Sequence, residues 1–422
     1  MSGTLIGFTV FGFILLIIGF INLKNKDLAQ ALMAGFILRG IVVFVGVYIW
    51  AFPYSTSADS RRFQSTAEFW VENFTIPEIW AFVTPGSGFF IAYMATLYQL
   101  LGTTDWIVIR SINVLLSVLI IFNIYYISKH LWNHKLATQN AWLAAIIPTL
   151  IIYGQGAERE AMFVFFLTLG LLFVVLWHRK NQIRFLVFAI LSFGFSSSFH
   201  EGGTLAIVGL AAYSFLTFLN SFFQGKAVNS GRFALSVVIV ILGMFFLYQY
   251  DIGLEEPGVG REGIDLEEFV EDRQSTEPSA ARAAYLQWLQ PGNPLDAIWQ
   301  TPVRMVYFLF SPFPWMLSTV WDMVGVIDMF IYVALGVGIY KSWPYIRQDP
   351  AKATLLVMLV FLVIAFAWGT QNYGTAMRHR AKMIPILLSL AGSVWGFRHF
   401  YFDQLHRKTG IKLTRLNNSR KV

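Results

Sequence analysis

The sequence predicts an all-α protein that crosses a membrane many times, and three observations lead to this prediction. The chain of 422 residues is 56% hydrophobic and 13% charged, whereas about 25% of the residues in an average soluble domain are charged. Its mean hydropathy is +0.58, and it contains 40 Phe, 17 Tyr and 14 Trp. Apolar stretches near the length of a spanning helix, about 20 residues, recur along the chain. This composition excludes a soluble enzyme, a disordered chain and a nucleic-acid-binding domain.

Residue content also limits the chemistry available. The chain contains no cysteine, so it has no disulfide, thiolate metal site, cysteine nucleophile or iron–sulfur cluster of its own. Any catalytic or binding group must therefore come from carboxylates, histidines, basic residues or aromatic rings.

Eleven stretches are predicted to span the membrane. No Lys or Arg precedes the first one and no small-residue cleavage site follows it, so we interpret it as a retained helix and not a signal peptide. Two further apolar stretches, 86–102 and 301–318, are ambiguous. The eleven predicted spans are residues 3–22, 31–52, 106–128, 138–153, 159–177, 184–199, 203–221, 233–250, 322–341, 353–369 and 381–397.

The basic residues of the connecting segments predict the orientation. Most of the 31 Lys and Arg lie in alternate connections and in the C-terminal tail. The positive-inside rule places these segments in the cytoplasm, with the N-terminus outside a plasma (inner) membrane. The net charge of +7 then reflects topology and needs no nucleic-acid partner. The basic segments are 23–30, 129–137, 178–184, 222–232, 341–352 and 398–422.

The alternation of basic and non-basic connections also decides whether the two ambiguous stretches cross the membrane. If either crossed the membrane, a basic loop that follows it would fall outside. We therefore predict two re-entrant or interfacial elements on the outer side. Pro85-Gly86 before the first and two prolines within 311–315 of the second agree with this, because proline breaks helices. The chain divides into an N-terminal transmembrane module (1–250), an outer loop (251–321), C-terminal helices (322–397) and a basic tail (398–422).

The first long outer loop, 53–105, contains a carboxylate close to the membrane. Residues 59–72 have helical spacing, with Phe63, Ala67 and Trp70 on one face. One interpretation is an amphipathic helix lying on the membrane with Asp59 as its N-cap. The other is a carboxylate at the mouth of a cavity, available as a base or a metal ligand.

Two short outer turns also carry ionisable residues. Glu158-Arg159-Glu160 opens a span from outside. Glu158 suits a helix N-terminus, but Arg159 opposes the helix dipole there, which favours a functional cluster. His200-Glu201 forms a tight turn, either merely solvated or a proton-transfer pair.

The outer segment 251–300 is strongly acidic, with eleven acids and three bases. Residues 265–290 are predicted to be helical and to be closed by Pro291-Gly292. A solvated face is the plain interpretation, and substrate gating or divalent-metal binding is the alternative. The spacing does not match a calcium-binding loop.

The most specific cluster is 371–385, in which Arg378, His379 and Arg380 lead into a span from outside. Two desolvated guanidiniums cost several kcal/mol unless they are paired. Phosphate is a natural partner because the guanidinium fork matches its geometry. Pairing with lipid headgroups or with the acidic loop is the alternative.

These features together resemble a known superfamily over residues 50–220. An acidic first outer loop, the segment 86–102 and the run Ile109-Arg110-Ser111-Ile112-Asn113 are similar to the N-terminal half of GT-C fold membrane glycosyltransferases, particularly the protein mannosyltransferase and aminoarabinose transferase branch. The C-terminal half, with segments 311–315 and 372–380, resembles polysaccharide-biosynthesis membrane proteins such as repeat-unit polymerases.

The resemblance implies that a sugar passes from a polyprenyl phosphate or diphosphate to a glycan or lipid acceptor on the outer face, in polysaccharide or glycoconjugate biosynthesis. It also implies an acceptor-side aspartate, matched by Asp59. The chain departs from the pattern by an extra span, 3–22, and by a single acid where some members have two. Competing interpretations are a repeat-unit polymerase and a non-enzymatic flippase or transporter, although we find no internal repeat of the kind transporters show.

The predicted roles follow. No cofactor is predicted, because the donor leaves with its own charged phosphate and a metal need not be required; a divalent metal is the alternative. The predicted catalytic residues are Asp59, Glu158 and His200. The predicted phosphate-binding residues are Arg378, Arg380, His379 and Arg159. The predicted sugar- or acceptor-binding residues are Tyr54, Glu68, Trp70, Glu201, Trp315, Asn372 and Tyr373.

Overall fold

The computed structural model describes residues 2–50, 58–81, 83–200, 202–224, 283–289, 295–319 and 322–392. In these residues the regular structure is helical, and one isolated bridge pairs Ala284 with Asn372. The all-α prediction is confirmed. The helices longer than five residues are α1 (Gly3–Asn22), α2 (Lys26–Phe44), α3 (Ala58–Asn73), α4 (Ile76–Ala81), α5 (Ser87–Leu101), α6 (Trp106–Leu131), α7 (His134–Ile146), α9 (Glu160–Lys180), α10 (Ile183–Phe199), α11 (Gly202–Phe223), α14 (Asp296–Phe310), α15 (Asp322–Ile346), α16 (Pro350–Gly369), α17 (Tyr373–Arg380) and α18 (Ile384–Leu390).

Seven helices in the described residues are long and apolar enough to cross a membrane. They are α1, α2 with its continuation η1 (Val45–Ile49), α6, α9, α11, α15 and α16. Helix α10 is apolar but shorter. The prediction of eleven full spans is therefore too high for this part of the chain, and the predicted span 233–250 lies outside the described residues.

Two predicted spans are not continuous helices in the structure. The stretch 138–153 divides into α7 and α8 (Pro148–Ile152), because Ile147 adopts an extended conformation before Pro148. The stretch 381–397 begins with a turn after Arg380, and the seven-residue helix α18 follows with Pro385 in its first turn. Neither stretch forms one continuous spanning helix among the described residues.

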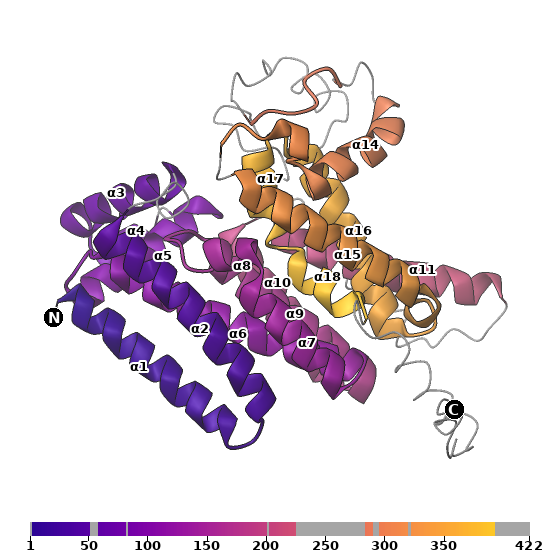
Figure 1. Cartoon of the computed structure of the whole chain (residues 1–422), viewed down its shortest axis with the longest axis horizontal. Helices are drawn as coiled ribbons and strands as arrows, with labels where there is room; N and C mark the ends of the chain where they lie inside the picture. Colours follow the sequence, from indigo (N-terminus) through magenta and orange to yellow (C-terminus); the bar gives the residue numbers. More distant parts are fainter. Residues whose placement is uncertain are drawn as a thin grey trace, which may run out of the picture.

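Helix α6 lies at the centre of the N-terminal part and packs against α1, α2, α7 and α9. Figure 1 shows α1 and α2 at one edge and α11, α15 and α16 towards the other. Large apolar side chains of α1, such as Phe8, Phe13 and Leu16, stay exposed. Exposed apolar faces on edge helices are typical of surfaces that contact lipid.

The predicted non-spanning elements are short helices. The stretch 86–102 forms α5, and 301–318 contains the end of α14, which stops at Phe310 before Ser311-Pro312. Figure 1 shows α3, α14 and α17 towards the same end of the long helices. The structure thus gathers elements from three parts of the sequence that were predicted to lie on one side.

Helix α3 confirms the helical spacing but corrects two details. The helix begins at Ala58, so Asp59 lies in its first turn and is not its N-cap. Its apolar face packs on α5, where the rings of Phe63 and Phe90 lie 5.6 Å apart, instead of lying on a membrane surface.

The predicted helix 265–290 is wrong over residues 283–289, which are the part of it that the structure describes. Residues 283–289 are not helical. The backbone N–H of Tyr285 donates to the carbonyl of Gln371 at 2.9 Å, and the N–H of Tyr373 donates to the carbonyl of Ala283 at 3.0 Å. This extended pairing fixes the segment against the start of α17.

Candidate active site

An ion-pair junction joins α3, α9 and α17. The Nη1 atom of Arg378 donates to Oδ2 of Asp59, a residue 319 positions earlier. The Nε atom of Arg378 lies 3.1 Å from Oε1 of Glu160, which is buried at the start of α9. We call Asp59, Glu160 and Arg378 the Arg378 junction. It brings together two residues that the sequence proposed for different roles, one on the acceptor and one on the phosphate.

The electrostatics of the junction keep its groups ionised. Partial burial would raise the pKa of the Asp59 carboxyl, but the hydrogen bond and charge of Arg378 hold it below its usual value, and Arg62 adds to this at 3.9 Å. Burial would lower the pKa of Arg378, but Glu160, Glu158 and Asp59 raise it above its usual value. Both members of this ion pair are therefore charged near neutral pH.

Glu158 lies beside the junction on a loop that α6 holds in place. The amide of Asn113 donates to the carbonyls of Gly156 and Glu158, and the hydroxyl of Ser117 donates to the carbonyl of Gly154. The buried Glu158 carboxylate accepts a 3.1 Å hydrogen bond from the Ser60 hydroxyl. Glu158 is thereby fixed next to the turn of α3 that carries Asp59.

Arg159 approaches the backbone that precedes α5. Gly86 has a φ of +78°, and a Cβ atom at this position would lie 3.0 Å from Nη1 of Arg159. Glycine at 86 therefore allows both the left-handed turn and the close approach of this guanidinium. Arg159 also acts electrostatically on Asp59 and Glu160, so it belongs to the same charged cluster.

The two histidines meet beside this cluster. The ring centres of His200 and His379 lie 5.5 Å apart, and that of Phe366 lies 4.8 Å from His379. Burial, followed by the charges of Lys382, Arg159 and Arg378, lowers the pKa of both imidazoles well below the usual value. Both are therefore neutral near pH 7, and the Nδ1 atom of His379 bonds with the Thr370 hydroxyl at 3.1 Å.

Arg380 does not join Arg378. Its side chain is buried, with Nη1 donating to the Leu309 carbonyl at 2.8 Å and its guanidinium 5.3 Å from the ring centre of Tyr332. It also interacts electrostatically with the buried Asp328. The pairing of Arg378 with Arg380 around one phosphate is therefore corrected, since these residues occupy different environments.

Two residues proposed for sugar binding make contacts that position α17, and their sugar-binding roles stay predictions. The Oδ1 atom of Asn372 caps the helix by accepting from the backbone N–H of Gly374 at 2.8 Å. Tyr373 is buried, and its hydroxyl lies 3.5 Å from that of Ser318. Both contacts hold the helix that presents Arg378.

The other proposed sugar ligands lie in varied places. Glu68 accepts from Gln64 at 2.7 Å, and Trp70 is half-buried against the core. Trp315 is 78% exposed and stacks on Phe313. Their sugar-binding roles stay predictions, and Tyr54 and Glu201 lie outside the described residues.

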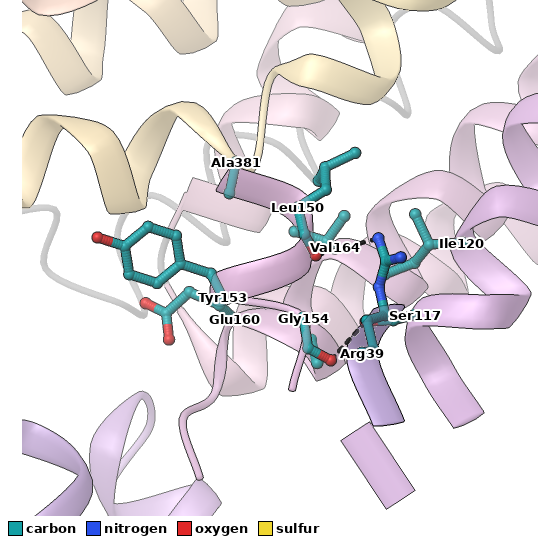
Figure 2. Close-up of a pocket in the computed structure, with 10 residues that line it drawn as sticks. Arg39, Ser117, Ile120, Leu150, Tyr153, Gly154, Glu160, Val164 and Ala381 are labelled. Atoms are coloured by element: carbon teal, nitrogen blue, oxygen red, sulfur yellow. Dashed lines mark hydrogen bonds between the residues drawn. The ribbon is translucent and has the colours of Figure 1, made fainter. Parts of the chain in front are cut away.

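A small cavity lies directly behind the junction. Figure 2 shows Glu160 and Tyr153 on one side of it and Arg39 on the other. Its volume of about 10 Å³ is close to the smallest that holds a single water molecule. Arg39 is buried there and donates to the carbonyls of Gly35, Ala144, Ala145 and Leu150. This cavity is too small for a sugar.

Sequence reasoning selected Glu158 and Arg159 but passed over Glu160, which pairs directly with Arg378. The signal was present, because Glu160 is the residue of this acidic–basic triplet that lies deepest towards the predicted span. Lys382 was also passed over, although it is buried 4.9 Å from the Phe366 ring centre. Within the part of the chain that the structure describes, no group of three or more His, Asp or Glu residues is arranged to hold a metal ion.

Comparisons with known proteins concern the sequence and the fold of the chain. Residues 84–249 match the family model described as dolichyl-phosphate-mannose-protein mannosyltransferase. The apo crystal structure of the Archaeoglobus fulgidus oligosaccharyltransferase superposes with a TM-score of 0.55 at 15% identity, over 92% of this chain and 52% of that one. Over residues 84–249 the sequence thus resembles membrane glycosyltransferases that use a lipid-linked sugar, and the fold of the chain is similar to that of the oligosaccharyltransferase. The resemblance noted from the sequence is confirmed.

A second solved structure has a similar fold. The A. fulgidus oligosaccharyltransferase AglB in complex with an inhibitory peptide and a dolichol-phosphate gives a TM-score of 0.55 at 14% identity, covering 93% of this chain and 53% of that one. The chain thus spans about half the length of these oligosaccharyltransferases. No curated protein sequence matches it.

Proposed function

We propose that this chain transfers a sugar from a polyprenyl-phosphate donor to an acceptor on the outer face of the membrane. The Arg378 junction is the observation that supports the proposal most directly. It holds an ionised carboxylate, Asp59, against a guanidinium that is matched to phosphate. An acceptor hydroxyl and a glycosyl phosphate need these two groups side by side.

Asp59 and Arg378 each have one role in the proposed reaction. The Asp59 carboxylate takes the proton of the acceptor hydroxyl as its oxygen bonds to the anomeric carbon of the sugar. The bond between that carbon and the phosphate oxygen breaks, and its electron pair stays on the departing polyprenyl phosphate. Arg378, with Arg159 nearby, stabilises the charge that develops on this phosphate.

Donor binding is proposed to activate the base. In the structure Arg378 pairs with Asp59, and this pairing lowers the pKa of the carboxyl and makes Asp59 a weak base. A donor phosphate competes for the same guanidinium. As Arg378 turns to the phosphate, Asp59 loses its counter-charge and its pKa rises, so that the base gains strength only when donor is present.

A monophosphate donor fits better than a diphosphate. Two adjacent guanidiniums would favour a diphosphate, the leaving group of a repeat-unit polymerase. Arg380, however, donates to a backbone carbonyl and lies against Tyr332. Because Arg380 makes these other contacts, Arg378 and Arg159 supply the positive charge for one phosphate group.

The test is a transfer assay on purified protein with radiolabelled polyprenyl-phosphate mannose, the kind of donor named by the matched family. Glycan-lipid and peptide acceptors are supplied separately, and the released polyprenyl phosphate is measured. We expect Asp59→Asn to lower turnover at least about 100-fold while the donor still raises the melting temperature.

The matched control is Glu72→Gln, an exposed carboxylate on the same helix, α3. It should retain wild-type turnover. Full activity of both Asp59→Asn and Arg378→Gln would refute the proposed site, whereas lost donor binding in Asp59→Asn would refute its role as a base.

A further inference from the structure

A second polar site lies apart from the Arg378 junction, between α1, η1 and α6. It is a pocket of about 290 Å³. Its lining includes Thr4 from α1, Tyr48 from η1, and Trp106 and Arg110 from α6. The three helices are all membrane-spanning candidates, and the pocket lies at their ends nearest α3.

Close packing of α1 on α6 forms one wall of this pocket. A Cβ atom on Gly3 would collide with Asp105, and one on Gly7 would lie 2.6 Å from Ile107. The backbone N–H of Gly3 also donates to Oδ2 of Asp105 at 2.9 Å. The carboxylate at the rim of the pocket is therefore engaged with the start of α1.

Arg110 is the unusual residue of the pocket. It is only 1% exposed, yet none of its three guanidinium nitrogens has a hydrogen-bond partner among the described residues. The guanidinium carbon lies 5.7 Å from the ring centre of Trp106, which also lines the pocket. A buried, unsatisfied guanidinium is costly, so an anion at this position would stabilise it strongly.

The charges nearby do not supply that anion. Glu158 is the carboxylate that acts electrostatically on Arg110, but it accepts from Ser60 and also interacts with Arg378. Together with Asp105 at the rim of the pocket, the acids Asp59, Glu158 and Glu160 match Arg378, Arg159, Lys382 and Arg62 in number. Arg110 adds one positive charge to this balanced set.

The surroundings indicate an amphiphilic ligand. Tyr48 and Thr4 hydroxyls lie 3.2 Å apart at the pocket and offer hydrogen bonds beside Arg110. Next to them, Leu5, Phe8 and Ile49 present exposed apolar side chains. A phosphate in the pocket with acyl chains along these side chains would satisfy both surfaces.

We propose that this pocket binds the phosphate headgroup of an anionic membrane lipid through Arg110. The site is separate from the donor site, and the proposal does not depend on the transfer reaction. Because a free phosphate offers the same headgroup chemistry, the test must separate a lipid from a free ion.

The experiment uses the delipidated full-length protein in detergent. Phosphatidylglycerol, phosphatidylcholine or inorganic phosphate is added, and the melting temperature and the number of bound lipids are measured, the latter by native mass spectrometry. We expect phosphatidylglycerol to raise the melting temperature of the wild type. Arg110→Gln should bind it about 10-fold or more weakly, because the charge-assisted hydrogen bonds are lost.

Two variants make the result specific. Lys24→Gln removes one exposed charge at the opposite end of α1 and should bind phosphatidylglycerol like the wild type. Thr4→Leu fills part of the pocket, leaves Arg110 unchanged, and should weaken lipid binding without removing a charge. It also keeps the test decisive if Arg110→Gln does not fold.

Three results would overturn the proposal. The first is equal binding of phosphatidylglycerol by the wild type, Arg110→Gln and Thr4→Leu. The second is a stabilisation by inorganic phosphate as large as that by phosphatidylglycerol, which would identify a free-ion site. The third is an equal, Arg110-dependent effect of phosphatidylcholine, which would show that the net charge of the lipid is irrelevant.

Discussion

Arg378 and Arg380 lie two residues apart on α17 but have opposite environments. Arg378 pairs with two carboxylates, Asp59 and Glu160, from distant helices. Arg380 is buried and donates to the carbonyls of Leu309 and Ala376. Side chains at positions i and i+2 of a helix point in different directions, so one short helix presents one arginine to the polar cluster and the other to the core.

The comparison indicates that the partners of Arg378 can be exchanged for another anion, whereas the partners of Arg380 are fixed. A carboxylate that neutralises Arg378 can be replaced by another anion, such as a phosphate, without leaving the guanidinium unsatisfied. A backbone carbonyl held in a helix cannot move aside in this way. We therefore interpret Arg378 as a binding group and Arg380 as a residue that fixes α17 on α14.

The largest effect is expected from Arg378→Gln. Removing a donor that stabilises the leaving phosphate should lower turnover about 100- to 1,000-fold. The free energy of unfolding should fall only modestly, because Lys382 and Arg159 still face the buried Glu160 and Asp59 is partly exposed. Steady-state transfer and denaturant unfolding of the same preparation measure both quantities. Turnover within a few-fold of wild type would contradict the interpretation of Arg378 as a binding group.

Arg380→Met should show the opposite pattern. It leaves the buried Asp328 without its positive neighbour, and breaking a buried charge pair costs about 3–5 kcal/mol. The free energy of unfolding should fall by this order, whereas the folded fraction keeps its transfer activity. Adding Asp328→Leu removes the stranded carboxylate and should restore most of the stability; a double variant no better than the single one would contradict this explanation.

The residue between the two arginines gives a pH test. His379 and His200 are neutral because burial lowers the pKa of each, so the unfolded chain binds more protons than the folded chain below about pH 6.5. Stability should therefore fall as the pH drops below 6.5, by about 1.4 kcal/mol per pH unit for each histidine. Unfolding at pH 7.5, 6.5 and 5.5 measures this slope, and His379→Gln should reduce it; an unchanged slope would mean that His379 does not contribute.

The smallest effect is expected from Ser60→Ala. The Ser60 hydroxyl donates to Glu158 beside the junction, and losing one such bond costs about 1 kcal/mol. Turnover should fall roughly five-fold. Ser65→Ala on the exposed side of the same helix, where the hydroxyl bonds only to the Arg62 carbonyl, is the control and should leave turnover unchanged.

Composition and hydropathy were sufficient to predict a helical membrane protein. The helix break predicted from the prolines at 312 and 314 is observed, because α14 ends at Phe310. Pro148 was not recognised as a break, because apolar content alone does not distinguish one long helix from two short ones. Arg378 was identified because a cation entering an apolar stretch is unusual. Its pairing with Asp59 and Glu160 was not predicted, since no local pattern relates either residue to one so far along the chain.

The position of Arg378 has a consequence for biosynthesis. The ribosome completes Asp59 and Glu160 long before Arg378, which lies 319 residues after Asp59. Until α17 is inserted, the two carboxylates lack the cation that joins them. A nascent or truncated chain that ends before α17 therefore contains the proposed base but no assembled site, so that the proposed site forms only after α17 has been inserted.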